Sequence, residues 1–209
     1  MTLSDCVLLP QQLLPLRIFE PRYRLMLKEA LASHRMFAVS LLDDAQITAT
    51  NPEPPHSFTC VGRITHHVEL EDGTSQLIIE GLRRARVLKV ERTQPYPRLT
   101  IAAVVDDVAE SADTVREVAR ILSYSEKIIE SLGPEAQPIL LRLHNLANQP
   151  GALADTVAGH LIADSEIRQN LLECLSVEKR LKSVADQLAR LDTARIIADL
   201  DKNSPQGLN

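Results

Sequence analysis

Residues 58–70 alternate between apolar and polar side chains, and an Asp-Gly pair at 72–73 follows them. Strict alternation is typical of a strand with one buried face, and Asp-Gly is a strong signal for the turn of a β-hairpin. The return strand is expected at 76–80. Simple alternation places His66 on the buried face, where it would be half-buried, and leaves His67 exposed. From a regular strand this pair cannot chelate one metal ion, because the two side chains point to opposite faces.

Further strands are expected around this hairpin. Residues 36–42, 85–92 and 99–105 form short apolar or one-sided runs of strand length. A helix is expected from Pro21, because proline suits a first helical turn and apolar residues then recur at helical spacing. The proline-rich stretch 43–57 lacks periodicity and is expected to be a long loop. Several short, closely spaced strands predict a small, strongly bent sheet or barrel.

The second half of the chain changes to the period of helices. Residues 111–200 carry apolar side chains three and four positions apart, and caps and breakers divide them into successive helices. The first is expected to end at Gly133-Pro134. Its expected buried stripe is Val115, Val118, Leu122, Ile129 and Leu132. The last helix carries a narrow apolar seam: Val177, Leu181, Val184, Leu188 and Leu191.

These two periods predict an α+β chain with two lobes. We expect a curved β lobe at residues 1–108, an α-helical bundle at 109–201, and a disordered tail at 202–209. A chain of 209 residues is long enough to bury its own core without disulfides or metals.

Charge and cysteine usage exclude several classes of protein. The chain has a net charge of −5, and residues 101–209 hold 17 Asp and Glu against 11 Lys and Arg, so nucleic acid is a poor partner for that half. The three cysteines are far apart and form no CxxC pair, which argues against zinc and redox motifs and fits a reducing, cytoplasmic environment. No apolar run approaches membrane-spanning length, and no signal peptide is recognisable.

Catalytic motifs are missing from the sequence. No two of the seven glycines are closer than eight residues, so neither a P-loop nor a dinucleotide fingerprint can be written. There is no HExxH motif, and Ser125 and Lys127 do not face each other on a helix. Catalytic residues, cofactors and metals are therefore expected to be absent.

A basic stripe at residues 83–98 is ambiguous. Its cations are Arg83, Arg84, Arg86, Lys89, Arg92 and Arg98, and Glu91 is its one acid. The stripe could bind an anionic partner such as RNA, with Arg83, Arg84 and Arg86 as candidate anion-binding residues. The simpler interpretation is a solvated strand edge. It is favoured because RNA binding usually needs aromatic residues for stacking, and only Tyr96 lies nearby.

Separated motifs resemble one known family. They are Leu14 to Tyr23 with the adjoining Arg24, Gly62, Asp72-Gly73, the run Gly81 to Val87, Pro150-Gly151-Ala152-Leu153-Ala154-Asp155, and Leu171 through Leu181. In this order they resemble the amino-terminal substrate-binding domain of the Lon ATP-dependent proteases. The resemblance covers nearly the whole chain and implies a PUA-like amino lobe followed by a helical bundle. It is identified as a free-standing copy, because the ATPase and peptidase domains do not follow.

The resemblance implies a non-catalytic protein-recognition module. It would bind unfolded or client proteins, or act as a proteolysis-related adaptor that docks on a protease or chaperone. The candidate protein-binding residues are Phe19, Tyr23, Pro54 and Pro55. Glu20 is expected to pair with Arg83 or Arg84. The alternative is a PUA-like nucleic-acid-binding protein that uses the basic stripe.

Overall fold

The structure is a computed structural model, and it describes residues 1–92, 95–108 and 111–203 of the chain. The expected tail at 202–209 falls mostly outside the described residues. Lys202 and Asn203, its first two residues, are the last residues of a helix. None of the helices in the described ranges is both long enough and apolar enough to cross a membrane.

The chain forms two compact units. The first consists of Met1–Asp106 together with Ala158–Leu175, and the second consists of Asp107–Val157 together with the chain from Ser176. The change from strands to helices therefore does not coincide with the division between units. Residues 158–175, which the sequence-based division placed in the helical lobe, belong to the first unit.

The first unit is built on a mixed six-stranded sheet. The strand order is β1-β3-β4-β5-β2, and β6 pairs with β5 off this path. Among the described strands of this sheet, β1 and β3 form the one parallel pair. The strands are β1 (Thr2–Leu3), β2 (Leu13–Ile18), β3 (Met36–Leu41), β4 (Phe58–Glu69), β5 (Ser75–Glu91) and β6 (Arg98–Ala103).

The return strand of the hairpin is longer than predicted. The expected strands at 76–80 and 85–92 are one continuous strand, β5, which pairs with β2 along its first part and with β6 along its last part. Gly81 lies between the two parts, and a Cβ atom there would be 2.0 Å from the carbonyl oxygen of Leu9. Because the backbones approach so closely, only glycine fits at this position.

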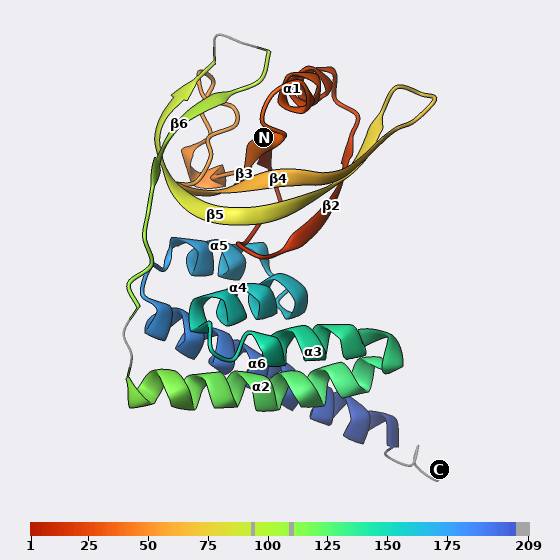
Figure 1. The fold of residues 1–209 in the computed structure, drawn as a ribbon, viewed down its shortest axis with the longest axis vertical. Helices are drawn as coiled ribbons and strands as arrows, with labels where there is room; N and C mark the ends of the chain where they lie inside the picture. Colours follow the sequence, from red (N-terminus) through yellow and green to blue (C-terminus); the bar gives the residue numbers. More distant parts are fainter. Residues whose placement is uncertain (93–94, 109–110, 204–209) are drawn as a thin grey trace, which may run out of the picture. The chain divides into compact units, whose positions relative to one another are not determined.

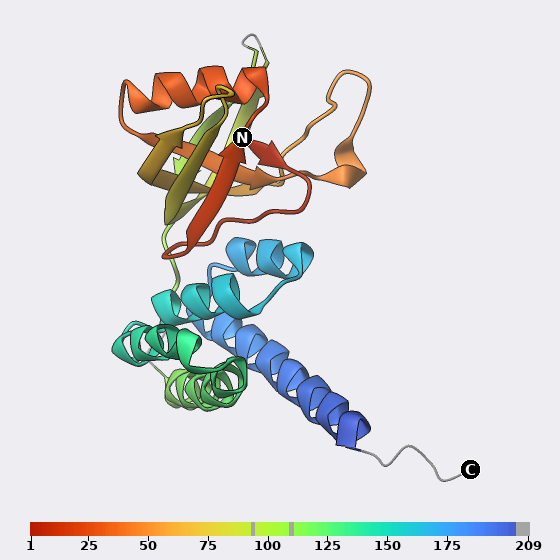
Figure 2. The ribbon, with the colours of Figure 1, turned by 90° about the vertical axis from the view of Figure 1, so that its right-hand side faces the viewer.

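Helix α1 (Pro21–Leu31) lies on the concave side of this bent sheet (Figure 1, Figure 2). Pro21 occupies the first turn, as predicted, and the residues expected in the buried stripe of the helix are buried. These are Tyr23, Met26, Leu27 and Ala30. The helix therefore fills the concave face of the sheet with its apolar side.

A β-bulge in β4 overturns the prediction for the two histidines. The pairing with β5 shifts register between Ile64 and His66, so Thr65 is an extra residue on β4. The shift reverses which side chains face inward after Ile64. His66 is consequently exposed, and His67 is the half-buried one, which is the opposite of what simple alternation gives.

The remaining helices are α2 (Ala112–Leu132), α3 (Gln137–Asn145), α4 (Pro150–Leu161), α5 (Ser165–Glu173) and α6 (Val177–Asn203). Helix α5 belongs to the first unit, where the Gln169 side-chain amide donates to the carbonyl oxygen of Phe58. In α6 the predicted seam is buried from Val177 to Leu188, but Leu191 is exposed.

Helix α2 buries a face that only partly matches the predicted one. Ile129 is buried as predicted, and Val118 and Leu122 are half-buried, but Val115 and Leu132 are exposed. Polar side chains take part of the buried face: Thr114, Glu117 and Ser125. Glu117 tolerates burial because Arg120, one turn along, pairs with its carboxylate. The spacing of apolar residues could not predict this buried face, because a charged residue such as Glu117 is expected on the exposed side even when an ion pair allows its burial.

Candidate functional site

Two grooves in the first unit lie beside helix α1. The first has a volume of about 580 Å³ and is bordered by α1, β3 and β6. The second has a volume of about 780 Å³ and is bordered by α1 and the β4–β5 hairpin. We call them the methionine groove and the hairpin groove after the residues that line them.

The methionine groove contains all three methionines of the chain. Met1, Met26 and Met36 line it, and Phe37, Val61 and Ile101 extend the apolar surface. Met36 has 40% of its surface exposed, although it begins a strand. The thioether side chain is flexible and polarisable, so it adapts to partners of different shape. Met1 and Met26 are each only 6% exposed, so the adaptable surface that the groove offers to a ligand is mainly that of Met36.

A hydrogen-bonded network forms one rim of the methionine groove. The Tyr96 hydroxyl donates to a carboxylate oxygen of Glu29, and Arg98 donates to the same oxygen over 3.1 Å. The pKa of Tyr96 is raised, chiefly because the hydroxyl is desolvated and secondly because it donates to Glu29. The network links α1 to β6 and fixes the position of the rim.

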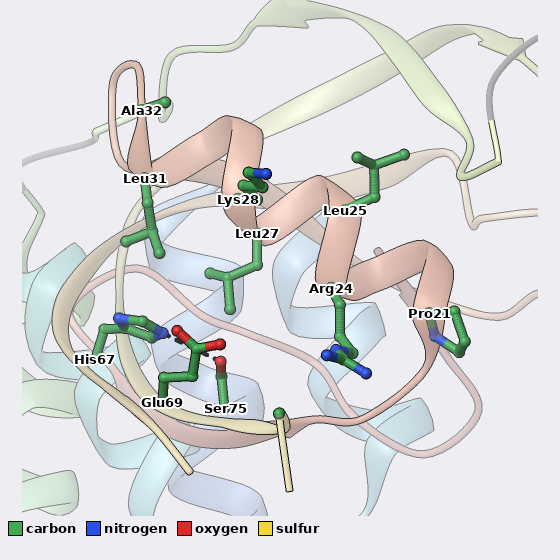
Figure 3. Close-up of a pocket in the computed structure, with 11 residues that line it drawn as sticks. Pro21, Arg24, Leu25, Leu27, Lys28, Leu31, Ala32, His67, Glu69 and Ser75 are labelled. Carbon is green, nitrogen blue, oxygen red and sulfur yellow. Dashed lines mark hydrogen bonds between the residues drawn. The ribbon is translucent and has the colours of Figure 1, made fainter. Parts of the chain in front are cut away.

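The hairpin groove combines an apolar floor with charged walls (Figure 3). Leu27 and Leu31 point from α1 toward the hairpin, and Arg24 points the same way from the neighbouring turn. On the opposite wall the ring Nε2 of His67 lies 3.1 Å from the hydroxyl of Ser75. The bulge in β4 is what turns His67 toward this groove. His66, by contrast, lines a separate hollow on the other face of the hairpin.

The predicted protein-binding residues differ in their accessibility. Phe19 is 61% exposed, whereas Tyr23 is only 2% exposed. The Tyr23 hydroxyl donates to the carbonyl oxygen of Thr2, and burial raises its pKa. Pro54 is buried and Pro55 is half-buried. Tyr23 and Pro54 therefore have structural roles, and only Phe19 presents a large apolar surface.

Glu20 does not pair with Arg83 or Arg84. Its carboxylate accepts a hydrogen bond of 2.9 Å from Nε of Arg22, two residues away. The same guanidinium donates to Glu53 over 2.7 Å. Arg22 therefore connects the start of α1 to the loop before β4. The prediction that Glu20 pairs with Arg83 or Arg84 was wrong.

The basic stripe presents less free charge than its sequence implies. Arg84 is 4% exposed, and its guanidinium contacts both carboxylate oxygens of Asp106 at 2.7 and 2.9 Å. Other cations of the stripe also have partners: Lys89 pairs with Glu91, Arg92 donates to the loop at 51–53, and Arg98 pairs with Glu29. Arg84 is consequently unavailable to an anionic ligand.

Two cations of the stripe are exposed without an acidic partner in the described ranges. They are Arg83 and Arg86, and the guanidinium of Arg86 lies over the ring of Phe58 at 5.3 Å from its centroid. Two cations give a much smaller positive surface than the continuous groove that single-stranded nucleic acids need. The geometry therefore favours the apolar grooves over the stripe as the candidate site.

The described residues do not bring three or more His, Cys, Asp or Glu side chains together at a metal-binding distance. None of the three cysteines is in a disulfide bond. His67 and Ser75 form a hydrogen-bonded histidine–serine contact in the hairpin groove, and Ser75 is buried. The described residues of both grooves offer a ligand apolar contacts, hydrogen bonds and charge.

Sequence reasoning missed most residues of both grooves. Met26 was placed on the buried stripe of α1, but Met1 and Met36 carried no prediction of their own. One signal was available, because all methionines of the chain fall within its first 36 residues. His67 was missed because a bulge leaves no mark in the alternation of apolar residues.

The comparisons with known proteins agree on one family. The family described as the ATP-dependent protease La (LON) substrate-binding domain matches residues 1–190. The Lon protease of Dictyoglomus thermophilum is 23% identical over 188 residues, which is 90% of this chain and 24% of that protein. The Lon protease of Azospirillum brasilense is 28% identical over 87% of this chain and 22% of its own length. The chain thus spans about a quarter of the length of these relatives.

Solved structures show the same fold. The amino-terminal domain of the Mycobacterium avium complex Lon protease superposes with a TM-score of 0.69 at 19% identity, covering 90% of this chain and 96% of the other. The Lon amino-terminal domain protein from Xanthomonas campestris gives a TM-score of 0.62 at 20% identity, covering 88% and 94%. With its mixed sheet and helical second half, and with residues 1–190 matched, the chain belongs to the Lon substrate-binding domain family.

Proposed function

We propose that this chain is a non-catalytic protein-recognition module that binds unfolded or client polypeptides in the methionine groove. The observation that carries the proposal is an open groove lined by all three methionines, in which Met36 is 40% exposed while Met1 and Met26 are buried. Family membership supports a role in protein recognition. Flexible thioethers suit a ligand whose side chains vary from one client to the next.

Several finer features belong to the same proposal. The curved sheet would be PUA-like, and the chain would act as an adaptor in proteolysis, with a protease or chaperone as a further partner. Three cysteines without a disulfide bond are consistent with the cytoplasm as its compartment. Phe19 would add an apolar contact next to α1, since it directly precedes Glu20 at the start of that helix.

The proposal is tested by titrating reduced, alkylated and fluorescently labelled α-lactalbumin with the purified chain and measuring anisotropy. We expect saturable binding at micromolar concentration. Met36→Lys should weaken it about tenfold or more, because a charge replaces an apolar contact worth about 1.5–3 kcal/mol when fully buried.

Leu88→Lys is the matched control for this titration. Leu88 is a 61% exposed apolar residue of β5 that is not among the residues lining the methionine groove. It should therefore leave the affinity unchanged. Equal weakening by both substitutions, or no binding by the unsubstituted chain at tens of micromolar, would refute the proposal.

A further inference from the structure

The two cations that face the hairpin groove lack acidic partners among the described residues. Arg24 and Lys28 lie one turn apart on α1, and both line the groove. Five of the ten other arginines of the sheet unit form ion pairs: Arg17 with Asp72, Arg22 with Glu53, Arg63 with Glu80, Arg84 with Asp106 and Arg98 with Glu29. Arg83 and Arg86 also lack an acidic partner among the described residues, but they do not line this groove, so Arg24 and Lys28 are the charges that the groove itself offers to a ligand.

The groove holds Arg24 where a ligand would meet it. The guanidinium reaches across to the hairpin turn, where a Cβ atom on Gly73 would lie 2.6 Å from Nη2 of Arg24. Gly73 has a φ of +73°, a conformation that glycine adopts without strain. The turn thus leaves room for the arginine at one end of the groove, above the apolar floor of Leu27 and Leu31 (Figure 3).

The opposite wall carries the opposite charge. Glu69 lines the groove from β4, and no ion pair with Arg24 or Lys28 is formed. A ligand carboxylate is therefore attracted to the α1 wall and repelled from the hairpin wall. Complementary charge of this kind fixes the orientation of a partner more than it adds affinity.

The hairpin also offers backbone groups to an extended ligand. Strand β4 pairs with β3 only from Cys60 to Arg63, and the last hydrogen bond on that side runs from the Ile64 amide to the carbonyl oxygen of Arg35. Beyond it, residues 66–69 pair with β5 on one side and with no other described strand. An unpaired strand edge accepts an extended polypeptide by main-chain hydrogen bonds.

We infer that the hairpin groove binds an extended polypeptide segment in which an acidic side chain flanks apolar residues. The acidic side chain contacts Arg24 and Lys28, and the apolar residues cover the half-buried Leu31 beside the buried Leu27. This site is separate from the methionine groove, and the inference rests on the proposed protein-recognition function because its ligand is also a polypeptide. It gives the module a preference in sequence that the methionine groove alone does not supply.

The test uses three fluorescent ten-residue peptides that are rich in Val and Leu. They share one sequence except at a central position, which is Glu, Gln or Lys. Anisotropy titrations of the unsubstituted chain should give the Glu peptide an affinity about 3- to 10-fold higher than the Gln peptide, as two partly exposed charge contacts would. The Lys peptide should bind most weakly. The difference should shrink in 1 M salt, since exposed charges are screened.

Charge reversal identifies the residues. The double substitution Arg24→Glu with Lys28→Glu should remove the preference for the Glu peptide and make the Lys peptide the better ligand. Arg83→Glu is the matched control, because Arg83 is an exposed cation outside the groove, and it should leave the order of the three peptides unchanged. Should the reversed chain fail to fold by circular dichroism, Arg24→Gln with Lys28→Gln replaces it and should equalise the Glu and Gln peptides.

The outcomes separate this inference from the proposed function. Equal binding of all three peptides to the unsubstituted chain overturns the inference and leaves protein recognition intact. A preference that survives the substitutions at Arg24 and Lys28 also overturns it. Loss of the preference on adding a single-stranded RNA oligonucleotide would assign the two cations to another class of ligand. Failure of every peptide and of unfolded protein to bind would refute both proposals.

Discussion

At the scale of single residues, Arg84 shows why a charge run is hard to interpret from sequence. It lies between Arg83 and Ala85 in a stretch that looks like one basic surface. Its partners are distant in the chain, since Asp106 is 22 residues away and the Leu172 carbonyl oxygen is 88 residues away. No local pattern carries that information, so the buried cation and its exposed neighbours could not be told apart.

We predict that Arg84→Ala lowers the free energy of unfolding by about 3 kcal/mol, because it removes one partner of a buried ion pair. Arg83→Ala, its neighbour in the chain, should change stability by less than about 0.5 kcal/mol, as surface substitutions usually do. Urea unfolding followed by circular dichroism measures both. Equal effects of the two substitutions would contradict the assignment of Arg84 to the interior.

Two glycines of the family motifs, Gly62 and Gly81, occupy positions where a larger residue would not fit. At Gly62 a Cβ atom would lie 2.5 Å from the side chain of Ile79, and at Gly81 it would meet the backbone of Leu9. The motif positions were recognised from the sequence by resemblance alone. Their cause is close packing between segments far apart in the chain, which the sequence does not display.

At the scale of elements, most helices and strands could be predicted from the sequence, and two strands and one bulge could not. The hairpin, α1 and the long α6 follow from alternation, helical spacing and breakers. Strands β1 and β2 were missed: β1 has two residues, and β2 contains Pro15 and has β5 as its one described neighbour. The bulge at Thr65 was missed because it changes the register of pairing, not the composition of the strand.

Two separate signature motifs meet in one contact between elements of the second unit. Asp155 of α4 and Arg180 of α6 form an ion pair of 3.1 Å, and both side chains are buried. Asp155 closes the Pro-Gly-x-Leu-Ala-Asp motif, and Arg180 lies in the closing-helix motif. The pair therefore joins the two motifs in the folded chain.

We predict that Asp155→Ala destabilises the chain by about 3–5 kcal/mol, since it leaves the Arg180 charge buried without its carboxylate. Replacing both residues with apolar side chains, Asp155→Leu with Arg180→Met, should recover part of this loss. Thermal unfolding monitored by circular dichroism gives the comparison. A double variant less stable than Asp155→Ala would contradict the view that the unpaired Arg180 charge causes the loss of stability.

At the scale of the whole molecule, the sequence predicts the succession of strands and helices but not the units they form. Residues 158–175 have a clear helical pattern, yet they belong to the unit that contains the sheet. Their assignment depends on tertiary contacts, such as the hydrogen bond from Gln169 to Phe58, and periodicity does not report those. The grooves beside α1 are likewise products of how α1 packs on the sheet.

We predict that stability rises with pH between about 5 and 8 in a chain that carries a free Met1 amino group. Burial lowers the pKa of this amine from 8.0 to about 5, and the amine donates to the Ala38 carbonyl oxygen. In that window the unfolded chain binds a proton that the folded chain does not, so the free energy of unfolding increases with pH by up to about 1.4 kcal/mol per unit.

The matched control is the same chain with an acetylated amino terminus. Acetylation removes the titrating group, so the part of the slope due to Met1 should vanish whatever the acetyl group does to overall stability. Urea unfolding at pH 5, 6, 7 and 8 compares the two chains. Identical slopes would show that the amine is not buried as described.

The central claim is that polypeptides bind in the methionine groove, and the chain offers a direct probe of it. All three methionines line this groove, so a sample labelled with ¹³C on the methionine methyl groups reports on that groove alone. On titration with unlabelled unfolded α-lactalbumin, the account predicts that the Met36 signal shifts or broadens and saturates at the affinity found by anisotropy. Saturable binding with all three methyl signals unchanged would contradict it.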